Sequence, residues 1–226
     1  MCMGVIPVRN VGEGAIMELK IVCFGDSLTE GYQSSAIGSQ GFTPYGRFLQ
    51  ERLGKRGRVW IRGVCGETTQ DMQLRFVGDV LSLDPRYVVI LGGTNDLGYG
   101  WPPQTIFDNL VRMYLQAQSH GIIPVGVTIP SLGGWERDRA SGSSLIDQAI
   151  QSRLTVNQAL FQYCSTNQIP LVDAFTATCD SGSQELASQY SEDGLHLTTL
   201  GYRTIADLLW SQIFEPLAGT TVPSHS

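Results

Sequence analysis

The chain has 226 residues, of which 42% are hydrophobic, enough for a folded core and too many for a disordered protein. Its 15 basic and 21 acidic side chains give a formal net charge of −6. This charge argues against nucleic acid as the main partner, because phosphate binding needs a clustered basic surface. No stretch approaches the roughly 18 apolar residues of a membrane-spanning helix, so we expect none.

The cysteine content and the ends of the chain suggest a location and a domain layout. Five cysteines, an odd number, without any C-x-x-C pair, argue against a disulfide framework and against a structural zinc site. The first residues lack the apolar run of a secretory signal, so we expect a cytoplasmic protein. Residues 1–16 read as an N-terminal extension, 17–216 as a single folded domain, and 217–226 as a disordered tail.

Short apolar runs alternate with helical patterns along the chain. The runs, next to Gly or Pro, predict buried strands at residues 19–24, 58–64, 87–91, 122–129 and 169–172. Apolar residues at helical spacing predict helices at residues 45–53, 68–81, 105–119, 145–164 and 200–213. This alternation, with strands apolar on both faces, is typical of a single α/β domain with a parallel sheet.

Three long loops follow predicted strand ends, at residues 33–42, 98–103 and 130–144. Loops of this length in a compact domain are usually functional or disordered. Because ligands of open α/β sheets bind outside the carboxyl ends of the strands, we expect the site where these loops begin.

Ser27 is the candidate nucleophile. It lies in the segment GDSLTEGY directly after the first strand, on a strand-to-helix turn where free N–H groups can stabilise an oxyanion. Ser27 and Glu30 also match the capping box S-x-x-E, so a purely structural role stays open at this point.

A serine nucleophile needs a base, and His196 is the candidate. His120 lies at a helix end, where a structural role is the better interpretation, and His225 lies in the predicted tail. Asp193 precedes His196 by three residues and can accept its Nδ1 proton in a turn. The alternative is an ordinary Asp-Gly turn followed by a surface histidine.

Asn95, in LGGTNDL after the third strand, has an NH₂ group that can donate to an oxyanion, or it forms an ordinary Asn-Asp turn. Gly66, in GVCGETT after the second strand, allows a backbone N–H to approach a ligand, or it is a turn glycine. No histidine cluster, H-E-x-x-H or carboxylate cluster predicts a metal, and no Gly-rich nucleotide motif predicts a cofactor.

Together these segments resemble the SGNH hydrolases, also called GDSL lipases or esterases. The family's four blocks match Ser27, Gly66, Asn95 and the pair Asp193 and His196, in order, between residues 21 and 202. The resemblance implies a three-layer α/β/α fold of flavodoxin-like type with a parallel five-stranded sheet. It also implies a small-molecule ester substrate and hydrolysis through a serine acyl-enzyme.

The resemblance assigns a role to each of these residues. Ser27 would attack the acyl carbon, His196 would be the base, and Asp193 would orient His196. The backbone N–H groups of Ser27 and Gly66 and the side chain of Asn95 would form the oxyanion hole.

Long loops beside the expected site suggest substrate-binding residues: Tyr99, Trp101, Leu132 and Trp135. Trp101 equally fits a role in packing its loop onto the body, whereas Trp135, after two glycines, favours a mobile flap. We expect short- or medium-chain carboxylic esters as substrates. A carbohydrate O-deacetylase, a thioesterase, a lysophospholipase and a non-catalytic ligand-binding domain on the same fold remain open.

Overall fold

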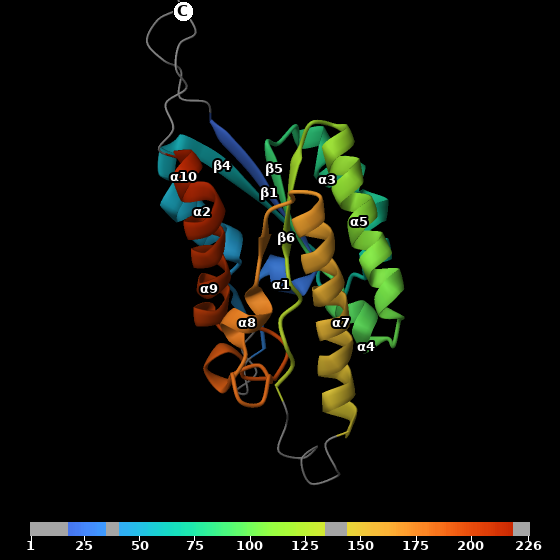
Figure 1. Cartoon of the computed structure of the whole chain (residues 1–226). Helices are drawn as coiled ribbons and strands as arrows, with labels where there is room; N and C mark the ends of the chain where they lie inside the picture. The colour runs from blue at the N-terminus through green and yellow to red at the C-terminus, as the bar shows by residue number, and fades with distance from the viewer. Residues whose placement is uncertain (1–17, 35–40, 134–143, 219–226) are drawn as a thin grey trace, which may run out of the picture.

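A parallel five-stranded sheet forms the centre of the computed structural model, which describes residues 18–34, 41–133 and 144–218 (Figure 1). In spatial order its strands are β4 (Gly57–Gly63), β1 (Leu19–Gly25), β5 (Tyr87–Leu91), β6 (Ile123–Val127) and β7 (Leu171–Val172). All four strand pairs are parallel. This confirms the predicted α/β fold.

The inner strands β1, β5 and β6 are largely buried on both faces, because their side chains alternate between two apolar cores. In β1, Ile21 and Cys23 belong to one core, and Val22 and Phe24 belong to the other. These four side chains are at most 1% exposed. Continuous apolar runs in the sequence therefore correspond to strands covered by helices on both sides.

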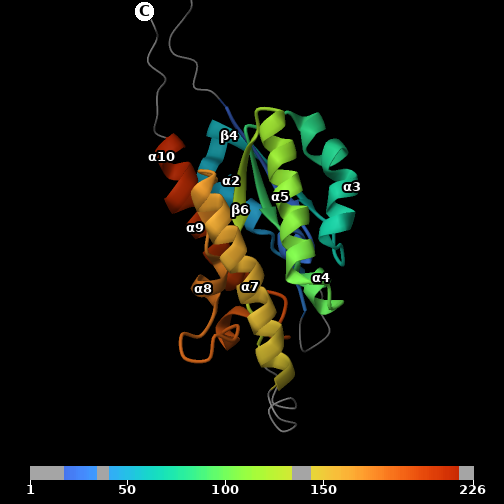
Figure 2. The same cartoon turned by 45° about the vertical axis from the view of Figure 1, so that its right-hand side comes forward.

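Helices cover both faces of the sheet (Figures 1 and 2). The helices α2 (Tyr45–Leu53) and α9 (Thr199–Leu209) pack on one face. On the other lie α3 (Thr69–Asp79), α5 (Pro103–Ser119) and α7 (Ser144–Thr166). No helix in the described ranges is long and apolar enough to cross a membrane.

The predicted boundaries of helices and strands agree best with the structure where the apolar pattern ends at a glycine. Helix α2 ends before Gly54, as expected, and β5 has the predicted bounds. The helix expected to end at residue 81 ends at Asp79, and a 3₁₀ turn, η2 (Leu81–Leu83), follows. Beyond α9 the chain continues as a π-helical segment, η4 (Trp210–Phe214), and as α10 (Glu215–Ala218).

Several short elements were not predicted. They are the helices α1 (Ser27–Glu30), α4 (Thr94–Gly98) and α8 (Ala174–Thr178), the strand pair β2 (Tyr32–Gln33) and β3 (Gly41–Phe42), and the 3₁₀ turns η1 (Gly54–Arg56) and η3 (Ser188–Tyr190). Helices α1, α4 and α8 directly follow or lie close after the strands β1, β5 and β7. They lie at the carboxyl edge of the sheet, with α1 near the centre of Figure 1 and α4 and α8 below it. Elements of two to five residues are too short to carry a periodic pattern.

Two paired glycines let α1 sit directly on this edge. Gly25 ends β1 and is in register with Gly63, which ends β4. A Cβ atom at Gly63 would lie 2.1 Å from the backbone nitrogen of Glu30, and one at Gly25 would lie 2.0 Å from the carbonyl oxygen of Leu91. Any side chain at either position would push α1 or a neighbouring strand away.

We expect Gly63→Ala to destabilise the protein by about 1–3 kcal/mol or more, because its Cβ meets backbone rather than a movable side chain. The matched control is Gly78→Ala in α3, where no atom lies within 4 Å of the new Cβ. Alanine there should be neutral or add about 0.5–1 kcal/mol. Urea unfolding of both variants measures the difference, and equal stabilities would contradict the close seating of α1.

Candidate active site

Ser27 is the first residue of α1, immediately beyond the carboxyl end of β1. The residue is 3% exposed, so it is buried at the carboxyl edge of the sheet rather than on the protein surface. Among the described residues, the Ser27 hydroxyl makes no hydrogen bond, either to the His196 ring or to another group. Nucleophile and base are often this loosely placed before a substrate binds.

The capping-box interpretation of Ser27 is wrong. Asp26 is the N-cap of α1, and its Oδ1 accepts from the backbone N–H of Leu28 at 2.9 Å. Glu30 does not turn back to cap the helix; its Oε2 accepts from the backbone N–H of Cys65 at 2.8 Å. Ser27 is therefore free of the capping role, and Glu30 instead ties α1 to the loop that contains Gly66.

Asp193 and His196 form the closest side-chain pair of the site. The His196 Nδ1 lies 2.7 Å from Asp193 Oδ2, while Asp193 Oδ1 accepts from the backbone N–H groups of Leu195 and His196 at 2.9 and 2.7 Å. Burial raises the pKa of Asp193, but these hydrogen bonds and the charge of His196 outweigh it and bring the pKa to about 2. An ionised carboxylate only accepts, so Nδ1 carries a proton, and in a neutral ring Nε2 is then the acceptor.

The chain after α1 brings the His196 loop to the Ser27 helix. The rings of Tyr32 and His196 meet edge to face with their centroids 4.6 Å apart. The carbonyl of Tyr32 accepts from the hydroxyl of Tyr202 in α9 at 2.6 Å, and the side chain of Gln33 donates to Thr199 Oγ1 at 2.9 Å. Two segments far apart in the sequence are thus held side by side at the site.

Gly66 and Asn95 also come together. Asn95 is the second residue of α4, and its Nδ2 donates to the carbonyl of Glu67 at 2.8 Å, next to Gly66. Gly66 has a φ of +81°, in the left-handed region, and no atom lies within 4 Å of where its Cβ would stand. Backbone conformation, and not crowding, is therefore what requires glycine here.

Three hydrogen-bond donors at this edge each have a hydrogen without an acceptor among the described residues. Within the described ranges, neither the backbone N–H of Ser27 nor that of Gly66 has an acceptor. Asn95 donates one of its two amide hydrogens to the carbonyl of Glu67, and the second remains available to a ligand. These are the three donors that the family resemblance implies for an oxyanion hole.

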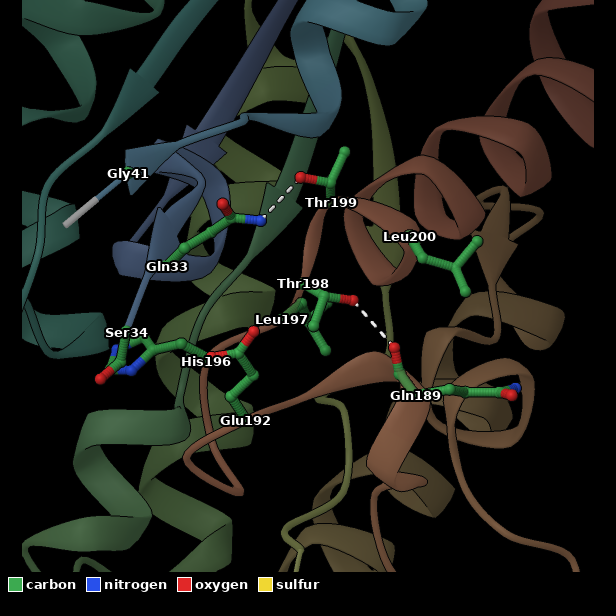
Figure 3. A pocket seen from close by; sticks show the side chains of 10 residues that line it. All are labelled: Gln33, Ser34, Gly41, Gln189, Glu192, His196, Leu197, Thr198, Thr199 and Leu200. Atoms are coloured by element: carbon green, nitrogen blue, oxygen red, sulfur yellow. Dashed lines mark hydrogen bonds between the residues drawn. The ribbon is translucent and has the colours of Figure 1, made fainter. Parts of the chain in front are cut away.

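A polar hollow of about 460 Å³ opens beside His196 (Figure 3). It lies between the β2–β3 strand pair and the start of α9. The residues that line it are Gln33, Ser34, Gly41, Gln189, Glu192, His196, Leu197, Thr198, Thr199 and Leu200. Figure 3 shows the hydrogen bond between two of these lining residues, Gln33 and Thr199. We call this cavity the inner hollow.

Three of the four residues expected to bind substrate lie in the described part of the chain. Tyr99 is 69% exposed at the end of α4, whereas Trp101 packs against the apolar core between the sheet and α3, α5 and α7. Leu132 is half-buried after β6, and its carbonyl accepts from the N–H of Leu186. Trp135 lies outside the described residues. Tyr99, Trp101 and Leu132 are not among the residues that line the inner hollow, and the role of all four in binding stays a prediction.

Two further groups that sequence reasoning missed hold the third block in place. Asp96 is fully buried and accepts from the backbone N–H of Thr69 at 2.9 Å, which joins α4 to the start of α3. Arg153 of α7 is 2% exposed and donates to Thr94 Oγ1 at 3.0 Å, one residue before Asn95. Burial lowers the pKa of Arg153 to about 10, although the charge of Asp26 raises it.

Among the described residues, neither His120 nor any group of possible metal ligands forms a second candidate site. His120 is exposed at the end of α5, where its Nδ1 lies 2.9 Å from the carbonyl of Gln116, as expected for a structural residue. His225 is outside the described ranges. In the part of the chain that the structure describes, no three histidine, cysteine, aspartate or glutamate side chains are placed to hold a metal ion.

Comparison with known proteins gives a family match over most of the chain. The model of the GDSL-like lipase/acylhydrolase family matches residues 23–204, which includes all five candidate catalytic and oxyanion residues. The lipoprotein YqeF of Bacillus subtilis is 35% identical over 127 residues. That match covers 50% of this chain and 50% of YqeF, so the chain matches about half the length of this relative.

Solved structures share the fold. A GDSL-like lipase from Bacteroides thetaiotaomicron has a TM-score of 0.71 at 24% identity, covering 91% of this chain and 93% of the other. The lipase/acylhydrolase from Enterococcus faecalis has a TM-score of 0.69 at 23% identity, covering 92% and 100%. At these identities the likeness shows a common architecture.

Buried Asp26 should make stability depend on pH. Burial raises its pKa to about 7, against the lowering effects of the Leu28 N–H and of His196. An unfolded aspartate has a pKa of about 3.9, so the folded state holds a proton that the unfolded chain loses between about pH 4 and 7. The stabilisation from this proton is complete below that window and is lost as pH rises through about 7.

We therefore expect Asp26→Asn to gain stability relative to the unmodified protein, by up to a few kcal/mol, as pH rises from 4 to 8. Asparagine keeps the cap and removes the titration. Melting temperatures across this range measure the difference, with the exposed Asp84→Asn as control. A constant difference at all pH values would mean that Asp26 does not titrate in this window.

Proposed function

Because the chain belongs to the GDSL-like lipase/acylhydrolase family, we propose that it is a serine esterase that hydrolyses short- or medium-chain carboxylic esters through an acyl-enzyme. The observation that carries this proposal is the 2.7 Å hydrogen bond between Asp193 and His196. It fixes the ring so that Nε2 is the free acceptor, and the ring lies against Tyr32, five residues after Ser27. Serine hydrolysis needs an imidazole that a carboxylate orients and a serine at the start of a helix, and these features support the proposal.

In the proposed reaction, Ser27 Oγ attacks the acyl carbon while His196 Nε2 takes its proton. The tetrahedral intermediate collapses, the bond from the acyl carbon to the alcohol oxygen breaks, and His196 returns the proton to the leaving alcohol. Water then attacks the acyl-enzyme, with His196 again as the base, and releases the carboxylic acid and free Ser27. Asp193 stays ionised throughout and stabilises the imidazolium.

The negative charge of each intermediate would be held by the Ser27 and Gly66 amides and by the spare hydrogen of Asn95. Such donors act best when they are fixed before the reaction begins. Asn95 is fixed by its bond to Glu67, and the Gly66 loop by the bond from the Cys65 amide to Glu30. The oxyanion hole would therefore need no rearrangement when charge develops.

The inner hollow supports a small acyl group. Among the described residues that line it, only Leu197 and Leu200 have long apolar side chains. A long acyl chain needs a predominantly apolar groove. A short acyl group has little apolar surface to bury, so it fits this polar site better than a long chain does.

Ser27→Ala should abolish hydrolysis of 4-nitrophenyl acetate, with a loss of turnover on the order of 10⁶, while the protein stays folded. Alanine is smaller than serine and fits at this buried position, which is 3% exposed. The helix α1 keeps its N-cap, because Asp26 and not Ser27 is the capping residue. Steady-state kinetics and circular dichroism measure the two effects. The control is Ser165→Ala on the exposed side of α7. Substantial turnover by folded Ser27→Ala would refute the nucleophile assignment.

Asn95→Ala should lower kcat by about 10²–10³, the usual effect of removing one oxyanion donor. KM should change little, because the uncharged substrate gains less from this donor than the intermediate does. Kinetics over a range of substrate concentration separates the two constants. A raised KM with kcat preserved would reassign Asn95 to substrate binding.

A further inference from the structure

We propose that Arg75 of α3 is a positioning residue that fixes the oxyanion hole relative to Ser27. The proposal rests on the proposed ester hydrolysis and adds to it a residue that lies outside the four sequence blocks. Arg75 acts through its neighbours, because its guanidinium group binds Gly25, which ends β1, and Glu67, which follows Gly66.

The guanidinium group of Arg75 joins two neighbouring strands near their carboxyl ends. Its Nη2 donates to the carbonyl of Gly25 at 2.8 Å, two residues before Ser27. Its Nη1 donates to the carbonyl of Arg62 at 3.1 Å, at the last residue but one of β4. The strands whose loops carry Ser27 and Gly66 are therefore both bound to one rigid, planar group.

The same group holds the loop that contains Gly66. The Nε of Arg75 donates to Glu67 Oε2 at 2.6 Å, and the two side chains are only 18% and 17% exposed. The carbonyl of Glu67 in turn accepts from Asn95 Nδ2 at 2.8 Å. Glu67 thus connects two of the proposed oxyanion donors, and a charge-assisted hydrogen bond to Arg75 holds it in place.

These contacts need the shape of arginine as well as its charge. A fourth hydrogen bond runs from Nη1 to Asp79 Oδ2 at 2.8 Å, and the guanidinium carbon lies over the ring of Phe24, 4.2 Å from its centroid. Lysine has the same charge, but its three donors share a single nitrogen. A lysine at position 75 could pair with one carboxylate and could not also join the two strands.

Arg75 pairs with two carboxylates, and only one of them adjoins the site. Glu67 precedes α3 and follows Gly66, whereas Asp79 is the last residue of α3, one turn after Arg75. An arginine that only stabilised the fold would depend on both pairs alike. An arginine that positions the oxyanion hole depends on Glu67 far more than on Asp79.

The test compares Glu67→Ala with the matched control Asp79→Ala, using hydrolysis of 4-nitrophenyl acetate. Each variant removes one carboxylate from Arg75, and the Glu67 carbonyl that binds Asn95 remains. We expect Glu67→Ala to lower kcat by about tenfold, less than the 10²–10³ expected for removal of Asn95 itself, because a displaced donor still acts in part. KM should change little, and Asp79→Ala should keep kcat nearly unchanged. Thermal unfolding should show similar losses of stability in both variants.

Two conservative variants separate position from charge. Glu67→Gln retains an oxygen that can accept from Arg75 and should recover most of the kcat lost in Glu67→Ala. Arg75→Lys retains the charge without the fork and should not recover the kcat of the unmodified protein. Adding Asn95→Ala to Glu67→Ala should lower kcat by a smaller factor than Asn95→Ala does alone, since the two act on one donor.

Equal losses of kcat in Glu67→Ala and Asp79→Ala, or a loss that appears in KM alone, would overturn the proposal. If the unmodified protein hydrolyses no ester, the proposed function fails, and hydrogen exchange then tests the positioning by itself. The amides of Cys65 and Glu67 are hydrogen-bonded in this loop. Faster exchange of these amides in Glu67→Ala than in Asp79→Ala would support the role of Arg75, and equal exchange would refute it.

Discussion

The close approach of α1 to the sheet is the constraint on which the site depends. The glycines at the ends of β1 and β4 have no Cβ, and a Cβ at Gly63 would lie 2.1 Å from the backbone of Glu30. Only without side chains there can a four-residue helix begin directly at the sheet edge and place Ser27 at its floor. The rest of the site is assembled by contacts with this helix and with the residues that follow it.

Hydrogen bonds between loops connect the four sequence blocks into one site. Glu30 joins the first block to the second, Asn95 joins the third to the second, and Tyr32 joins the first to α9 and to His196. The first three loops, which follow strands, are therefore also held by hydrogen bonds to another loop or helix. Buried Arg153 adds a fourth support from α7, on the far side of the third block. Such bracing is what keeps donors and base in fixed positions while charge develops.

The sequence predicted most of the fold, because long elements carry a repeated pattern. Helix α2 and strand β5 agree with their predicted bounds, whereas α1 and α4 are too short for a period of 3.6 residues to show. At the site, the pattern could not decide whether Ser27 or its neighbour Asp26 caps α1, because both residue types are good caps. Glu30 does not complete a capping box with Ser27, because its carboxylate accepts from the Cys65 amide, a contact that exists only in the folded protein.

The walls of the inner hollow show a further limit of sequence reasoning. Long loops with aromatic residues suggested Tyr99 and Trp101, whose role stays a prediction, and the sequence did not suggest Gln33 and the start of α9, which line the hollow beside His196. Gln33 and Thr199 are 166 residues apart, and no local pattern relates them. Ser27, Gly66 and Asn95 lie just after strand ends, and with Asp193 and His196 they carry recognisable motifs, whereas Gln33 and Thr199 meet only after folding. Substitutions in the wall of the inner hollow can therefore alter substrate preference without moving the reacting groups, so one shared motif set can accompany different substrates on this fold.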